Sequence, residues 1–221
     1  MTVVALTSPL LWYTARATGI ASLLLLTAAT VLGALTASRS ASSLWPRFAV
    51  SEVHRQVSLL AVVFLAVHIL SSVLDTFVHI PLLAAVVPFI SSYRPLWVGL
   101  GAVAFDLFLA VIVSSLLKSR ISAASWRAIH WLALACWPVA VIHSIGIGTD
   151  IRFGWLQVVV GLCIASVLSA VGWRWWRWMR RPQPSSPLPH IRPAPRRKTG
   201  PQATDRRPVG AGSSSGRGDR P

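Results

Sequence analysis

Four histidines lie inside long apolar segments of this 221-residue chain, and their spacing is regular. His54 and His68 are fourteen residues apart in one segment, and His130 and His143 are thirteen apart in another. Polar and ionisable side chains are costly in hydrocarbon, so those found in membrane-length segments usually have a function. Imidazole nitrogens bind metal ions and transfer protons. Four of them in two such segments indicate a shared role.

The composition is typical of a helical membrane protein. Hydrophobic residues make up 54% of the chain and charged residues only 12%. Apolar runs of about twenty residues recur, which is the length that crosses a bilayer core of about 30 Å. The alternating strands of a membrane barrel, each about ten residues long, are not seen in the sequence. We therefore predict an all-α integral membrane helical bundle.

Five spans are predicted, within a membrane domain that covers residues 1–178. They run from about Leu10 to Leu35, Glu52 to Leu74, Pro95 to Leu117, Trp126 to Ile147 and Phe153 to Gly172. A further apolar segment, Phe77 to Ser92, is short and contains two prolines. It is expected to be a surface or re-entrant segment rather than a crossing.

Residues 179–221 form a basic tail rich in Pro and Arg. The tail has few apolar side chains to bury, so we expect it to be disordered. The formal net charge of +15 is concentrated there, and a basic segment after a span favours anionic lipid over nucleic acid as its partner. The positive-inside rule predicts a multi-pass protein of the cell membrane with a cytoplasmic tail and, after five crossings, an external N-terminus.

The second and fourth spans are separated by one crossing, so they run in the same direction, and this pairs the histidines by depth. At helical rise the two spacings correspond to about 21 and 20 Å. His54 and His130 then lie near the cytoplasmic surface, and His68 and His143 lie toward the outside. One histidine from each span at each level suits bis-imidazole ligation of two b-type hemes. A zinc site needs ligands within about 2 Å of one ion, which the separation of the levels excludes.

Helical phase is a difficulty for the fourth span. Fourteen residues return to within about 40° of the same face, but thirteen miss it by about 140°. We predict a distortion between His130 and His143, and Pro138 could cause it because it removes a helix hydrogen bond. The alternative for any single membrane histidine is a packing or proton-relay role.

Charged residues near the histidines are candidates for supporting roles. Arg55 and Arg127 could bind propionates of the inner heme, and Arg16 those of the outer heme. Lipid-facing arginines that extend to the headgroups would look the same in sequence. Asp106, near the middle of the third span, could bond a ligand histidine, pair with Arg16, or stay protonated as a packing residue.

The histidine pattern resembles that of a known family. His54-x13-His68 with His130-x12-His143 is similar to the heme-ligand spacing of the ferric reductase and NADPH oxidase transmembrane domain family, especially its small bacterial members that consist of the membrane domain alone. Further similar stretches are Leu11-Trp12-Tyr13, Arg16-Ala17-Thr18-Gly19, His54-Arg55, Trp126-Arg127, His130-Trp131, Trp137-Pro138 and Gly148-Thr149-Asp150. The resemblance covers about residues 10–175. Family members usually have six spans, where five are predicted here.

The resemblance implies an oxidoreductase component, an electron-transfer subunit that carries electrons across the membrane through two b hemes. No dinucleotide-binding fingerprint follows Trp178, so a separate flavin reductase or a quinol is the expected donor. Ferric iron or an extracytoplasmic redox protein, such as a methionine sulfoxide reductase, is the expected acceptor. The alternative from another class is a cofactor-free membrane transporter or scaffold.

Overall fold

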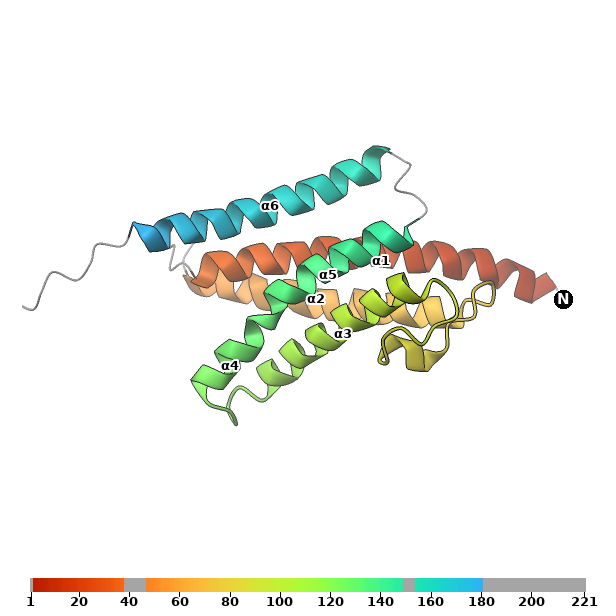
Figure 1. Ribbon diagram of the computed structural model, residues 1–221, viewed down its shortest axis with the longest axis horizontal. Coiled ribbons are helices and arrows are strands. Elements are labelled where there is room, and N and C mark those ends of the chain that lie inside the picture. Colours follow the sequence, from red (N-terminus) through yellow and green to blue (C-terminus); the bar gives the residue numbers. More distant parts are fainter. Residues whose placement is uncertain (1, 38–46, 149–153, 181–221) are drawn as a thin grey trace, which may run out of the picture. The chain divides into compact units, whose positions relative to one another are not determined.

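The computed structural model describes residues 2–37, 47–148 and 154–180, and within them the regular secondary structure is all helical, with no β-strand. The elements are α1 (Thr2–Ala37), α2 (Arg47–Leu74), η1 (Leu82–Ala85), α3 (Pro95–Leu116), α4 (Ala123–His130), α5 (Leu132–Ile147) and α6 (Gly154–Met179), shown in Figure 1. The all-α membrane fold is thus confirmed.

Five helical segments in the described chain are long and apolar enough to cross a membrane, which confirms the five predicted spans. These are Pro9–Thr36, Phe48–Leu74, Pro95–Leu116, Ala123–Ile147 and Gly154–Met179. The last helix continues through the tryptophan-rich stretch to Met179. The predicted tail is outside the described residues from 181 onward.

Side-chain chemistry accounts for the ends and the apolar interiors of the helices. Pro95 occupies the first turn of α3, where its missing N–H costs nothing, and the Ser122 hydroxyl caps α4 by accepting from the Ser125 amide at 3.0 Å. Hydroxyl groups inside the spans donate to carbonyls three or four residues earlier, as Thr27 does to Leu23 at 2.7 Å. These bonds leave few unsatisfied donors facing lipid.

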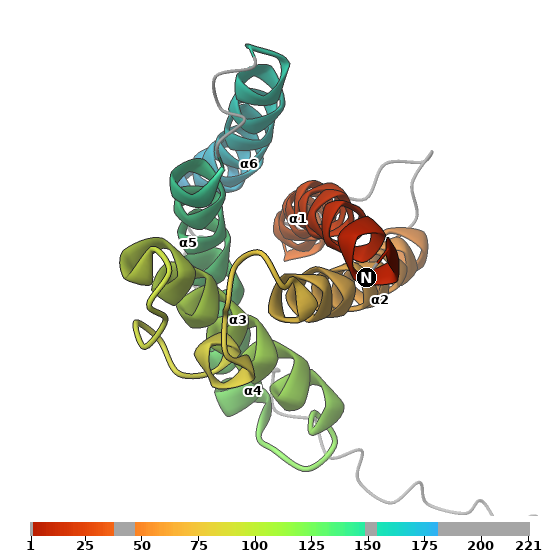
Figure 2. The same cartoon turned by 90° about the vertical axis from the view of Figure 1, so that its right-hand side faces the viewer.

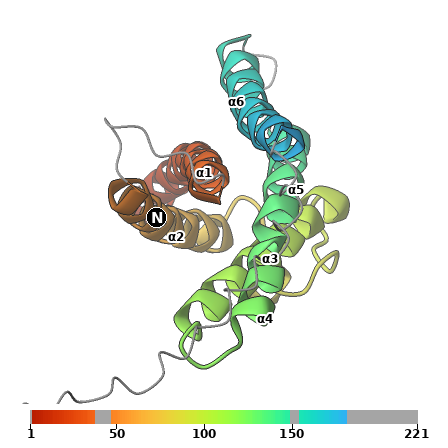
Figure 3. The ribbon, with the colours of Figure 1, turned by 90° about the vertical axis from the view of Figure 1, so that its left-hand side faces the viewer.

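The helices pack in antiparallel pairs, α1 with α2 and α3 with α5, and α6 lies against α1. Figures 2 and 3 show α1 and α2 nearly end-on and α3 and α5 obliquely. A buried apolar cluster joins α1, α5 and α6 through Leu23, Trp137, Val141, Val160, Cys163 and Val167. Helix α2 packs almost only against α1. The two spans that carry the histidines, α2 and α4–α5, are therefore not closely packed on one another.

The fourth span is interrupted between its two histidines. Helix α4 ends at His130 and α5 begins at Leu132. A 3₁₀-type hydrogen bond joins the Leu134 amide to the Trp131 carbonyl at 3.0 Å. Such a turn winds more tightly than an α-helix, so it rotates the residues that follow. The predicted distortion is present, but it lies at Trp131, whereas Pro138 lies inside α5.

The segment from Phe77 to Ser92 contains η1 and turns and is not one of the spanning helices. Its small residues are partly buried, with Ala84 and Ser91 the most enclosed. Asp75, just before it, accepts a hydrogen bond from the Phe77 amide at 3.0 Å. The segment therefore folds as a connection between α2 and α3.

Candidate functional site

The two predicted histidine pairs are formed. The ring centroids of His54 and His130 lie 6.3 Å apart with the planes inclined by 75°. Those of His68 and His143 lie 6.5 Å apart with the planes inclined by 76°. In both pairs one ring comes from α2 and the other from the α4–α5 span. The interrupted span thus presents both of its histidines to α2.

These separations match two imidazoles that share one metal ion. Ring nitrogens about 2 Å from a common metal place the ring centroids about 6 Å apart. Among the described residues there is no group of three or more His, Cys, Asp or Glu side chains that could hold an ion. Two protein ligands are sufficient where a porphyrin supplies the other four, so the donor set suits heme rather than a zinc site.

Hydrogen bonds fix the tautomer of three of the four histidines. The Nδ1 atoms of His68 and His143 lie 2.7 Å from the carbonyl oxygens of Ala15 and Trp97, respectively. That of His54 lies 3.0 Å from the Ala29 carbonyl oxygen. A carbonyl oxygen only accepts, so each Nδ1 carries the proton and donates it. The Nε2 lone pair is then available for a metal, the arrangement typical of metal-ligating histidines.

Glycines allow the rings to approach these carbonyls. Gly19, Gly33 and Gly101 each lie four residues after an acceptor, on the same face of α1 or α3. A Cβ built on Gly101 would lie 2.7 Å from Cε1 of His143, and one on Gly19 would lie 3.0 Å from Cε1 of His68. The sequence contained a signal that we did not use: Gly19 and Gly33 are fourteen residues apart, the same spacing as His54 and His68.

His130 differs from the other three histidines. Its Nδ1 is buried and has no hydrogen-bond partner among the residues that the structure describes. Its ring stacks on Trp126, with centroids 4.9 Å apart and planes inclined by 22°. The Lys118 ammonium lies 4.4 Å from the centroid of that tryptophan. Packing, rather than a carbonyl, holds this ring.

A cavity of about 350 Å³ surrounds the outer pair, His68 and His143. Its lining is mostly apolar and comes from α1, α2, α3, α5 and α6 and from the segment around η1. Arg16 and Trp12 also line it, with the guanidinium carbon 4.3 Å from the centroid of a Trp12 ring. Cavities that bind cofactors are typically apolar, with a few polar groups that orient the ligand. The predicted site residue Arg16 thus shares a cavity with the outer pair.

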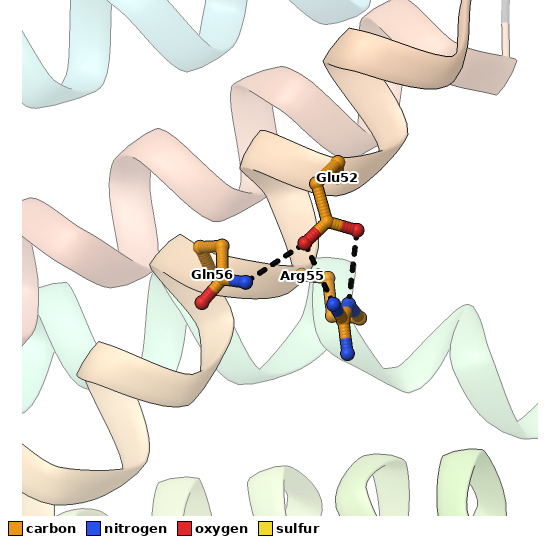
Figure 4. A network of polar contacts seen from close by, with 3 residues as sticks. All are labelled: Glu52, Arg55 and Gln56. Carbon is orange, nitrogen blue, oxygen red and sulfur yellow. Dashed lines mark hydrogen bonds and ion pairs between the residues drawn. The ribbon is translucent and has the colours of Figure 1, made fainter.

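The two arginines predicted for the inner level lie on exposed surface. Arg55 forms a bidentate pair with Glu52, at 2.7 and 3.1 Å, and Glu52 also accepts from Gln56 (Figure 4). The side chains of Arg55 and Glu52 are 65% and 52% exposed. Arg127 is exposed as well. The propionate role of both arginines stays a prediction.

Asp106 makes no hydrogen bond with any of the four histidines. It is half-buried on α3 and makes no hydrogen bond or ion pair with any described residue. The Nδ1 atoms of His54, His68 and His143 are bonded to backbone carbonyls instead. Sequence reasoning missed these carbonyls because any residue can supply one.

The chain was also compared with known proteins. No family model, curated protein or solved structure matches it, so the function of the histidine pairs has to be inferred from their own geometry and chemistry.

Proposed function

We propose that the chain holds two b-type hemes and carries single electrons across the membrane. The observation that supports this most strongly is the presence of two facing histidine pairs, each with centroids about 6 Å apart. The free Nε2 atoms, the lack of close packing of α2 on the α4–α5 span and the cavity at the outer pair support it further.

In this proposal His54 and His130 hold the inner heme iron and His68 and His143 the outer one. Bound heme supplies the one-electron chemistry, since its iron alternates between the ferric and ferrous states. The protein fixes the rings, orients them through the carbonyl bonds and keeps water away with apolar side chains. Two histidines would hold each heme iron, which would favour outer-sphere electron transfer over binding of oxygen at iron. The fourteen-residue step of α2 places the two levels about 21 Å apart along the helix.

The partners proposed are those of a ferric reductase-like membrane cytochrome. A separate flavin reductase or a quinol would donate electrons, and ferric iron would accept them at the other side. The same path of electron transfer would serve an extracytoplasmic redox protein such as a methionine sulfoxide reductase, and this chain would then be its heme subunit. The basic tail would lie in the cytoplasm against anionic lipid.

Heme content tests the proposal directly. Protein purified from heme-replete cells is expected to contain two hemes per chain and to give a b-type spectrum after reduction with dithionite. A cofactor-free transporter or scaffold predicts no absorbance in the visible region. Folded, colourless protein would therefore rule out the electron-transfer function.

Arg16 should tune the outer heme because it lines the same cavity as His68 and His143. A nearby cation favours the ferrous state, so Arg16→Gln is expected to lower the reduction potential of the outer heme by about 60 mV, a tenfold change in the reduction equilibrium. Arg120→Gln, an exposed change beyond the end of α3, is the control. Equal potentials of the outer heme in both variants would contradict a role for Arg16.

A further inference from the structure

The helix pairs that carry the carbonyl acceptors run in a fixed antiparallel register. Along α1 and α2, the Ala15 carbonyl meets His68 and the Ala29 carbonyl meets His54, fourteen residues apart on both helices. Along α3 and α5, the Trp97 carbonyl meets His143 at 2.7 Å and the Ala104 carbonyl meets Cys136 at 3.3 Å, seven residues apart on both. A further step of seven residues along α3 reaches Val111. The same step back along the partner span ends within one residue of His130, so Val111 lies opposite His130 in this register.

Val111 is thus the residue whose carbonyl should serve His130, and its surroundings differ from those of the other three acceptors. Those acceptors are followed four residues later by glycine, whereas Val111 is followed by Ser115. The Ser115 and Ser114 hydroxyls both donate to the Val111 carbonyl, at 2.8 and 2.9 Å. The Val111 carbonyl therefore already accepts hydrogen bonds from two side chains. Ser115 also has a Cβ at the position where the other three acceptors are followed by a glycine that lets a ring approach.

The missing bond has an electronic consequence for a metal held by His130. A hydrogen bond from Nδ1–H to a carbonyl increases negative charge on the ring and makes Nε2 a stronger donor. A stronger axial donor stabilises ferric over ferrous iron and lowers the reduction potential. The outer pair has two such bonds, both 2.7 Å long. The inner pair has one, at 3.0 Å, and its His130 has none among the described residues.

The Arg16 cation near the outer pair has a counterpart at the inner level, where Lys118 lies over the tryptophan that stacks on His130. We propose that Ser115, by occupying the glycine position opposite His130, makes the inner heme the higher-potential of the two. This rests on the proposed binding of two hemes. In protein reduced by one electron, the electron then resides on the inner heme, and its transfer outward depends on an acceptor that oxidises the outer one. Ser115 is thereby a positioning residue that acts through His130.

Ser115→Gly tests this, because it should let His130 reach the Val111 carbonyl. Both this variant and its control also carry Ser114→Ala, since the Ser114 hydroxyl would otherwise still donate to that carbonyl. Spectroelectrochemical titration of the full-length holoprotein is expected to show the inner potential lowered by about 59 mV, a tenfold shift for one electron, with the outer potential unchanged. Ser115→Ala is the matched control: it removes the hydroxyl but keeps the Cβ, so it should shift the inner potential much less. An inner potential that does not move in Ser115→Gly, or that moves equally in both variants, would overturn the proposal.

A variant at the outer level gives a second test that does not depend on any Ser115 variant folding. Removing the outer heme with His68→Ala should abolish the lower-potential step and leave the higher one. If the lower-potential step remains instead, the assignment is wrong even though two hemes are bound. Absence of heme would be a different result, because it would refute the proposed function itself.

Discussion

Protein in which His68 is replaced by alanine is expected to retain one low-spin heme per chain instead of two. The variant removes one of two axial ligands at the outer level, where the partner ring is 6.5 Å away. The inner pair lies about 21 Å farther along α2, so its ligands are untouched. Heme content measured against protein concentration and the low-spin signals in electron paramagnetic resonance spectra check this. Any heme left on His143 alone would be five-coordinate and give a high-spin signal instead.

Three further variants make the pairing testable. His143→Ala should remove the same low-spin signal as His68→Ala, whereas His54→Ala should remove the other one. His79→Ala is the control, because His79 is an exposed histidine outside the spans, and it should keep both signals. Loss of the same signal in His143→Ala and His54→Ala would show that the rings are paired differently.

The membrane fold and the histidine pairs were predictable because each depends on a simple length scale. An apolar run of about twenty residues specifies a span, and the rise of a helix converts spacing into depth. His54 and His130 could therefore be paired, as could His68 and His143, without knowledge of any side-chain contact. The matching depths follow because the second and fourth spans run in the same direction, which the order of the spans already implied.

The rotation of the fourth span could not be predicted in the same way. An interruption at Trp131 carries no glycine or proline signal, and Pro138 was the only proline within the span to which a distortion could be assigned. The backbone at Trp131 stays close to helical values, with φ −65° and ψ −20°. A departure this small is set by packing, here by the stacking of Trp126 on His130, and packing is not encoded in the hydropathy pattern.

The contacts that orient the histidine rings also could not be predicted from the sequence. Sequence reasoning looked for charged partners and selected Arg55, which pairs with Glu52 on the exposed face of α2. The contacts that orient three of the four rings come from backbone carbonyls instead. Every residue has a backbone carbonyl, so the sequence does not show which carbonyl accepts a hydrogen bond. The one indirect sign is a glycine such as Gly101, which lets a ring approach the backbone. Glycine in the interior of a helix costs about 1 kcal/mol relative to alanine, so such positions are informative when they recur at the spacing of the histidines.

Gly101→Ala is accordingly expected to weaken the outer heme site strongly. The new Cβ would lie 2.7 Å from Cε1 and 2.8 Å from Nδ1 of His143, so the ring must move and lose its bond to the Trp97 carbonyl. Leaving a buried donor unsatisfied costs about 1–3 kcal/mol, which corresponds to roughly 5- to 150-fold weaker binding. The measurement is the rate at which each low-spin signal is lost when the protein is incubated with a heme-scavenging protein.

Other glycines supply graded controls for this effect. Gly161→Ala in α6 would place a Cβ with nothing within 4 Å, so both hemes should be retained as in the unaltered protein. Gly33→Ala would place one 3.4 Å from Cε1 of His54, an ordinary contact, and should disturb only the inner heme and only slightly. Gly19→Ala, at 3.0 Å from His68, should fall between Gly33→Ala and Gly101→Ala. If Gly101→Ala retains the outer heme as well as Gly161→Ala does, close approach of the ring to the α3 backbone is not what holds His143 in place.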